Sequence, residues 1–88
     1  MPVEELALPS SETVARLAVS STGFIFDPVT GRSFSVNEGG LAILRALQNG
    51  ARTLPDVVHL LSAAFDAPLT VLERDVIEFS SRLKEAFR

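Results

Sequence analysis

The fold is decided by residues 23–38, whose sequence is GFIFDPVTGRSFSVNE. In its second half, Phe34 and Val36 alternate with serines, which is the period-two pattern of a half-buried strand. An Asp-Pro pair followed by Gly31 favours a tight connection to the apolar segment before it, because glycine accepts the left-handed backbone conformation that turns require. We therefore expect a β-hairpin here, followed by a helix that begins after Asn37.

A further strand is expected just before this hairpin. In residues 15–20, Ala15, Leu17 and Val19 alternate with more polar or smaller residues, again with a period of two. Residues 1–12 contain two prolines and no clear period, so we interpret them as a flexible N-terminal arm. The folded domain is then expected to cover residues 13–88.

Three helices are expected after the hairpin, each starting at a side chain that can cap a helix. The capping residues are Asn37, Thr53 and Thr70, the last within a Thr-x-x-Glu capping box. Apolar residues then recur at helical spacing, and the stripe of the third helix comprises Leu72, Val76, Phe79, Leu83 and Phe87. The predicted class is α+β and winged-helix-like, with a three-stranded antiparallel sheet followed by three helices.

The composition excludes several classes of function. The 88 residues are 47% hydrophobic, carry a formal net charge of −3 and contain no cysteine and one histidine. Disulfides, thiol chemistry and cysteine or multi-histidine metal sites are therefore excluded, and we expect no cofactor. No apolar run is long enough to span a membrane, and the acidic N-terminus lacks the basic region of a signal peptide, so a cytoplasmic protein is expected.

Individual polar residues give no sign of catalysis. His59 is expected on the exposed face of its helix, and Gly39-Gly40 is expected to let the first of the three helices pack closely on the sheet. Asp75, Glu78 and Arg82 share one flank of the last helix, but no nucleophile or metal ligand accompanies them. We expect Glu78 and Arg82 to form a helical i,i+4 pair.

The edge of the expected sheet is the most informative candidate site. Residues 32–36 contain no proline and no central charge, so little in them would block the addition of another strand. A plain strand that is covered by another element is an equally good interpretation of the same residues.

The order and spacing of these motifs resemble the PqqD-like family. The resemblance covers residues 15–88 and is carried by Gly23–Pro28, Gly31–Leu44, Asn49-Gly50 before Arg52-Thr53, and Arg74–Leu83. It implies a RiPP recognition element, a small non-catalytic domain that binds the leader of a ribosomally synthesised precursor peptide. Such a domain presents the peptide to a modifying enzyme, often a radical-SAM enzyme.

The resemblance also implies where the leader binds, namely as an added strand beside the third β-strand and against the third helix. Carried onto this chain, the pairing edge is expected at Ser33, Phe34, Ser35 and Val36. The helical side is expected at Asp75, Glu78, Phe79 and Arg82. The opposite flank of the helix, with Glu73, Ile77 and Lys84, is the alternative.

The same architecture would also suit a winged-helix DNA-binding protein. Its recognition helix should present mainly cations to the phosphates, yet the last predicted helix contains four basic and four acidic residues. We therefore expect neither a nucleic-acid partner nor a membrane partner. An open strand edge could also pair with a second copy of the chain, so a homodimer is a further expectation.

Overall fold

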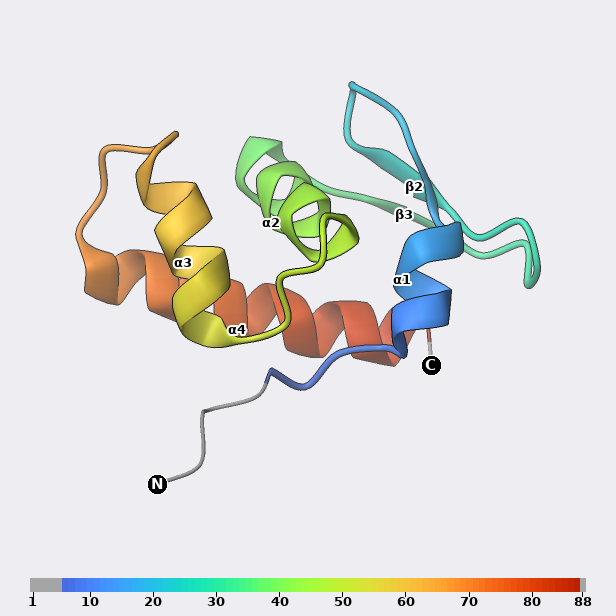
Figure 1. Ribbon diagram of the computed structural model, residues 1–88. Coiled ribbons are helices and arrows are strands. Elements are labelled where there is room, and N and C mark those ends of the chain that lie inside the picture. The colour runs from blue at the N-terminus through green and yellow to red at the C-terminus, as the bar shows by residue number, and fades with distance from the viewer. Residues whose placement is uncertain (1–5, 88) are drawn as a thin grey trace.

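The computed structural model describes residues 6–87 and has the expected α+β architecture (Figure 1). A short helix precedes the sheet, and three helices follow it. The elements in chain order are α1 (Ser11–Arg16), β1 (Ala18–Val19), β2 (Phe24–Phe26), β3 (Ser33–Ser35), α2 (Glu38–Gln48), α3 (Leu54–Ser62) and α4 (Leu69–Ala86).

The three strands form an antiparallel sheet with the order β1-β2-β3. Ile25 in the central strand lies opposite both Val19 and Phe34, and its side chain is fully buried. Phe24 and Phe26 point to the other face of the sheet and remain partly exposed, as the alternation of a strand requires. The sheet therefore has one face toward the helices and one face toward solvent.

The helices α2, α3 and α4 enclose the core together with the inner face of the sheet. Figure 1 shows α4 passing along α3 and α2 toward the sheet. The core is continuous, and its fully buried side chains include Ile25, Leu44, Val57, Val76 and Leu83. Within residues 6–87, no helix combines the length and the apolar character that a bilayer-spanning segment needs.

The prediction of a strand at residues 15–20 is largely wrong, because α1 includes residues 15 and 16. The Ser10 side chain accepts the backbone N–H of Thr13 at 3.2 Å and so caps this helix. The buried residues Thr13, Val14 and Leu17 are spaced three and four apart, which is helical, whereas Ala15 is exposed. Only Ala18–Val19 pairs as a strand.

The end of α1 is held by a side chain from α2. The Gln48 amide donates to the carbonyl oxygens of Val14, at 3.1 Å, and Leu17, at 3.0 Å. These carbonyls lie in the last turn of α1 and at its C-cap, where the helix has no further N–H groups to donate to them. A long-range contact that no local pattern reveals therefore stabilises a six-residue helix.

The first residues of the predicted N-terminal arm, 1–5, lie outside the described residues. Helix α1 begins at Ser11, two residues before the expected start of the domain. Leu6 and Leu8 pack against the core, and the Pro9 carbonyl accepts a hydrogen bond of 3.2 Å from Arg52. Residues 6–12 are thus in contact with the rest of the domain.

Two of the three predicted helix caps are confirmed. The Asn37 side chain accepts the Gly40 N–H at 2.9 Å, and the Thr53 side chain accepts the Asp56 N–H at 3.3 Å. The predicted cap at Thr70 is wrong, because α4 already starts at Leu69 with Pro68 at the N-cap. The Pro68 carbonyl accepts the N–H groups of residues 71 and 72, so the helix begins without a capping side chain.

Candidate functional site

Strand β3 lies at one edge of the sheet and exposes backbone groups on its outer side. The N–H of Val36 donates to Gly23 O, and the N–H of Asp27 donates to Arg32 O, both at 2.8 Å. Because hydrogen-bonded and non-hydrogen-bonded pairs alternate in an antiparallel ladder, the N–H and C=O groups of Ser33 and Ser35 point away from β2. Of the four residues predicted as the pairing edge, these two serines carry the outward-facing groups.

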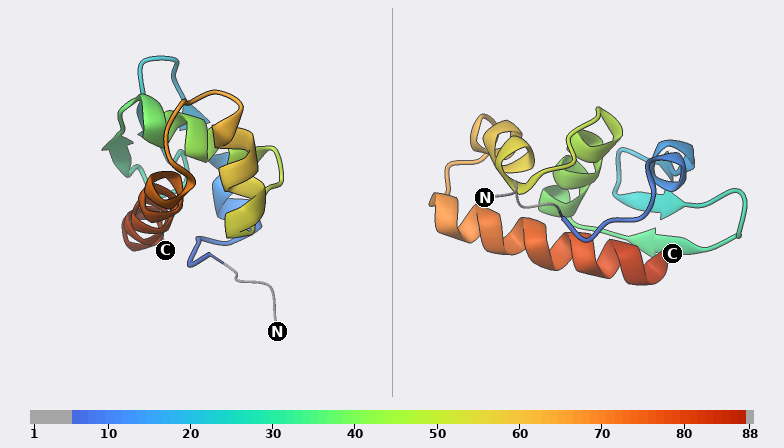
Figure 2. Two further views of the ribbon diagram at one scale, coloured as in Figure 1. Left: turned by 90° about the vertical axis from the view of Figure 1, so that its left-hand side faces the viewer. Right: turned by 60° about the horizontal axis from the view of Figure 1, so that its bottom comes forward.

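Helix α4 runs beside β3 in the opposite direction. The start of β3 lies near the end of α4, where Arg32 donates to Ala86 O at 3.1 Å and the Phe34 and Phe87 rings meet edge to face, 6.2 Å between centroids. The end of β3 lies near Phe79, which Gly40 approaches from α2. The right-hand view of Figure 2 shows β3 along the C-terminal half of α4.

At Gly40, the backbone of α2 comes unusually close to the end of β3 and to α4. A Cβ atom at this position would lie 2.9 Å from Val36 Cβ and 2.9 Å from Phe79 Cε1, which is shorter than the contacts that Cβ atoms make in proteins. A Cβ atom at Gly39 would meet only Asn37 Oδ1, at 3.6 Å. The close-packing interpretation of the glycine pair is therefore confirmed, and Gly40 is the residue responsible.

Two adjoining hollows follow α4 on the side of β3, and we call them together the α4 groove. The first has a volume of about 330 Å³ and is lined by Asn37, Gly39, Gly40, Ile43, Leu61, Phe65, Ala67, Leu72, Asp75, Glu78, Phe79 and Arg82. The second is shallower and is lined by Phe34, Ser81, Arg82, Glu85 and Ala86. Arg82 lines both hollows, so the groove extends from the N-terminal half of α4 to β3.

The groove contains all four α4 residues named from the sequence. Asp75, Glu78, Phe79 and Arg82 line the first hollow. On the other flank, Glu73 and Ile77 are exposed, and Lys84 lines a separate hollow beside the N-terminal segment. The structure thus places the chosen flank beside the end of β3, while a role of these residues in binding stays a prediction.

The charged residues of the groove are arranged differently from the expected helical pair. Glu78 and Arg82 form no ion pair, although both are exposed and lie one turn apart. The guanidinium of Arg82 instead lies over the Phe34 ring, 5.7 Å from its centroid, in a cation–π arrangement. Two carboxylates therefore lie near one end of the groove, whereas near β3 the cation Arg82 is accompanied by Glu85.

Comparison with known proteins agrees with this geometry. Residues 23–87 match the family model described as Coenzyme PQQ synthesis protein D (PqqD). The chain belongs to the PqqD family. The match includes β2, β3, α2, α3 and α4, which provide the open edge and the groove.

A solved structure resembles this PqqD-family chain. It is lasso peptide synthetase B1 complexed with the leader peptide, and it is 26% identical in sequence. The superposition has a TM-score of 0.64 and covers 78% of this chain and 81% of the other. A search of curated proteins gave no match.

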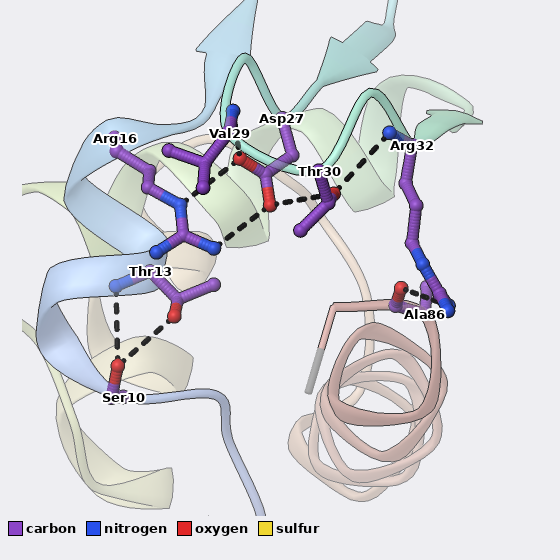
Figure 3. Close-up of polar contacts among 8 residues, drawn as sticks. All are labelled: Ser10, Thr13, Arg16, Asp27, Val29, Thr30, Arg32 and Ala86. Carbon is purple, nitrogen blue, oxygen red and sulfur yellow. Dashed lines mark hydrogen bonds and ion pairs between the residues drawn. The ribbon is translucent and has the colours of Figure 1, made fainter.

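The hairpin of the PqqD-family domain is held by a partly buried ion pair that the sequence did not reveal (Figure 3). The Asp27 carboxylate is inaccessible to solvent and accepts two hydrogen bonds from Arg16, at 3.0 and 2.9 Å. It also accepts the Val29 N–H at 2.9 Å and the Thr30 hydroxyl at 3.0 Å. These contacts connect α1 to the turn that precedes β3.

The protonation of Asp27 follows from these contacts. The hydrogen bonds from Arg16 lower the pKa of the carboxyl group strongly, and this effect exceeds the opposing effect of burial. The Val29 N–H and the Thr30 hydroxyl lower the pKa further. The sequence marked Asp27 as a turn residue, but its partner was assigned to a strand, so the pairing went unnoticed.

The remaining candidate from the sequence lies away from the groove. His59 is exposed on α3, as expected. Among residues 6–87, no cluster of three or more histidine or acidic side chains is arranged to hold a metal ion.

Proposed function

We propose that this chain binds the leader segment of a ribosomally synthesised precursor peptide and presents the peptide to a modifying enzyme. The observation that carries the proposal is the open edge of β3, where Ser33 and Ser35 direct their backbone groups outward beside the α4 groove. A peptide in extended conformation would add a fourth strand at this edge. Its alternate side chains would enter the groove.

Backbone pairing and the groove have different roles in this proposal. Hydrogen bonds to Ser33 and Ser35 supply affinity for any extended segment, whereas contacts with Asp75, Glu78, Phe79 and Arg82 supply selectivity. The similar lasso peptide protein, which is complexed with a leader peptide, supports this class of ligand. The chain acts as a binding partner, and chemistry is performed by a separate enzyme, for which we propose the radical-SAM class.

The charges of α4 do not favour the DNA-binding alternative. Along α4, the cations Arg74, Arg82 and Lys84 are interspersed with carboxylates, and Asp75 and Glu78 lie in the groove itself. A surface of this kind would repel a phosphate backbone as much as attract it.

The proposal is tested by NMR titration of the isotope-labelled chain with leader peptides of precursors encoded beside its gene. Amide signals of residues 33–36 and of the groove side of α4 are expected to shift, while those of α3 residues near His59 should change little. Leader peptides N-methylated at one residue at a time should lose affinity at alternate positions only, because alternate N–H groups pair with β3. Titration that leaves β3 and α4 unchanged contradicts the proposal.

A further inference from the structure

We infer that the α4 groove selects a peptide strand by the order of its charges: a basic residue, followed two positions later by an acidic residue, in the N-to-C direction. This inference rests on the proposed function and specifies its ligand. It starts from the charges of the groove itself. Asp75 and Glu78 line the first hollow, and Arg82 marks the junction with the second hollow beside Phe34. Glu85 also lines the second hollow, but it lies three residues beyond Arg82 on α4 and so beyond the two positions, Glu78 and Arg82, that define the order.

The separation of these charges matches the repeat of a strand. Glu78 and Arg82 are four residues apart on α4, which corresponds to about 6 Å along the helix axis. Two residues of an extended strand span about 6.7 Å, and their side chains point to the same face. Residues n and n+2 of an added strand can therefore face Glu78 and Arg82 at the same time.

The direction of the strand follows from the packing of β3. The start of β3 lies beside Ala86 and Phe87, and its end lies toward Phe79, so β3 is antiparallel to α4. An antiparallel partner of β3 would consequently run parallel to α4. We choose this orientation because antiparallel pairing is slightly more stable per residue. The N-terminal part of the peptide then lies near the two carboxylates, and its later part lies near Arg82.

The lining of the first hollow suits a long basic side chain. Besides its carboxylates, it presents apolar surface from Ile43, Leu61, Phe65, Leu72 and Phe79. The methylene chain of an arginine or lysine can lie on such surface while its charged end reaches Asp75 and Glu78. An acidic residue two positions later would meet the guanidinium of Arg82, which has no carboxylate partner among the described residues.

The test is selection of a random-peptide phage library on three proteins: the wild type, E78R/R82E and the control E73R/K84E. Both double variants exchange one acid and one base on α4, but the control does so outside the groove. We expect the wild type and the control to enrich basic-x-acidic sequences, and E78R/R82E to enrich acidic-x-basic sequences. A peptide from the wild-type pool should bind E78R/R82E about tenfold more weakly, since two attractive pairs become repulsive.

NMR spectra of each variant establish that it is folded, and chemical-shift changes at Ser33 and Ser35 identify peptides that add to β3. If such peptides show no charge order, or keep the same order with E78R/R82E, the inference is overturned while the proposed function stands. If no selected peptide perturbs β3, the proposed function is overturned, and the inference with it.

Discussion

The guanidinium of Arg82 covers the ring of Phe34, with 5.7 Å between Cζ and the ring centroid. This contact connects α4 to the middle residue of the edge strand, and it lies where the two hollows of the α4 groove meet. Arg82 therefore borders the groove beside β3 and can also offer its positive charge to a ligand.

Replacing this cation should separate binding from stability. We predict that Arg82→Ala lowers the free energy of unfolding by only about 0.5–1 kcal/mol, the usual value of an exposed cation–π contact. Leader affinity, measured by isothermal titration calorimetry, should fall about two- to fivefold because an ion pair in the groove is lost. Lys84→Ala on the other flank is the control and should bind normally. Equal affinities of the two variants would count against the groove.

The outward N–H of Ser35 should be required for strand addition. Ser35→Pro removes this donor, whereas Ser35→Ala keeps the backbone intact and changes only an exposed side chain. We predict at least tenfold weaker leader binding for Ser35→Pro and unchanged binding for Ser35→Ala, by calorimetry. Circular dichroism establishes that both variants are folded. Normal binding by folded Ser35→Pro contradicts pairing at this residue.

The two adjacent glycines of α2 should respond in opposite ways to alanine. Gly40→Ala places a methyl group 2.9 Å from Val36 Cβ, and we predict a loss of about 1–3 kcal/mol in the free energy of unfolding from overpacking. Gly39→Ala meets no such contact and should gain up to about 1 kcal/mol from helix propensity. Urea denaturation measures both. A stable Gly40→Ala variant would show that α2 can move away from β3 at little cost.

The Arg16–Asp27 pair should make stability depend on pH in acid. Because the folded-state pKa of Asp27 is lowered, the pair contributes its full stabilisation above the carboxyl group's ordinary pKa of about 4. Below that pH the stabilisation decreases progressively until the pH has fallen through the lowered folded-state pKa. We predict that Asp27→Asn is less stable than the wild type at pH 7 and that the difference narrows toward pH 3. Asp66→Asn, at an exposed position, is the control. A difference that is independent of pH would contradict the assignment.

The free edge of β3 should also govern self-association. We predict that the chain forms a dimer at high concentration and that saturating leader peptide dissociates it, because both partners need Ser33 and Ser35. Sedimentation velocity with and without peptide measures this competition. A dimer that persists with bound peptide would have its interface elsewhere on the chain. A chain that stays monomeric at all concentrations would show that two copies do not pair through their β3 strands.

The parts of the fold that the sequence predicts are those with a local physical cause. The alternation in residues 32–36, the turn at Gly31 and the caps at Asn37 and Thr53 each depend on neighbouring residues, and the structure contains all of them. Helix α1 was missed because the alternation of Ala15, Leu17 and Val19 also fits a strand, and because the contact of Gln48 with Leu17, 31 residues away, cannot be inferred from a local pattern. The pairing of Arg16 with Asp27 was missed because Arg16 was assigned to the predicted strand.

The sequence predicted which residues share one flank of α4, but it did not predict their contacts. Helical periodicity placed Asp75, Glu78 and Arg82 on one flank, but only packing shows that this flank lies beside the end of β3. The position of Arg82 over Phe34 could not be predicted, since the same arginine had a carboxylate one turn away as an alternative partner.

The shortness of β3 has a consequence for how the ligand specificity of such a domain can change. A three-residue edge offers few backbone groups, so it is a poor template for fibril growth and discriminates little between sequences. Discrimination then falls to exposed α4 side chains, whose replacement costs little stability. Such a domain can acquire a new ligand through a few surface substitutions while its core and sheet stay unchanged.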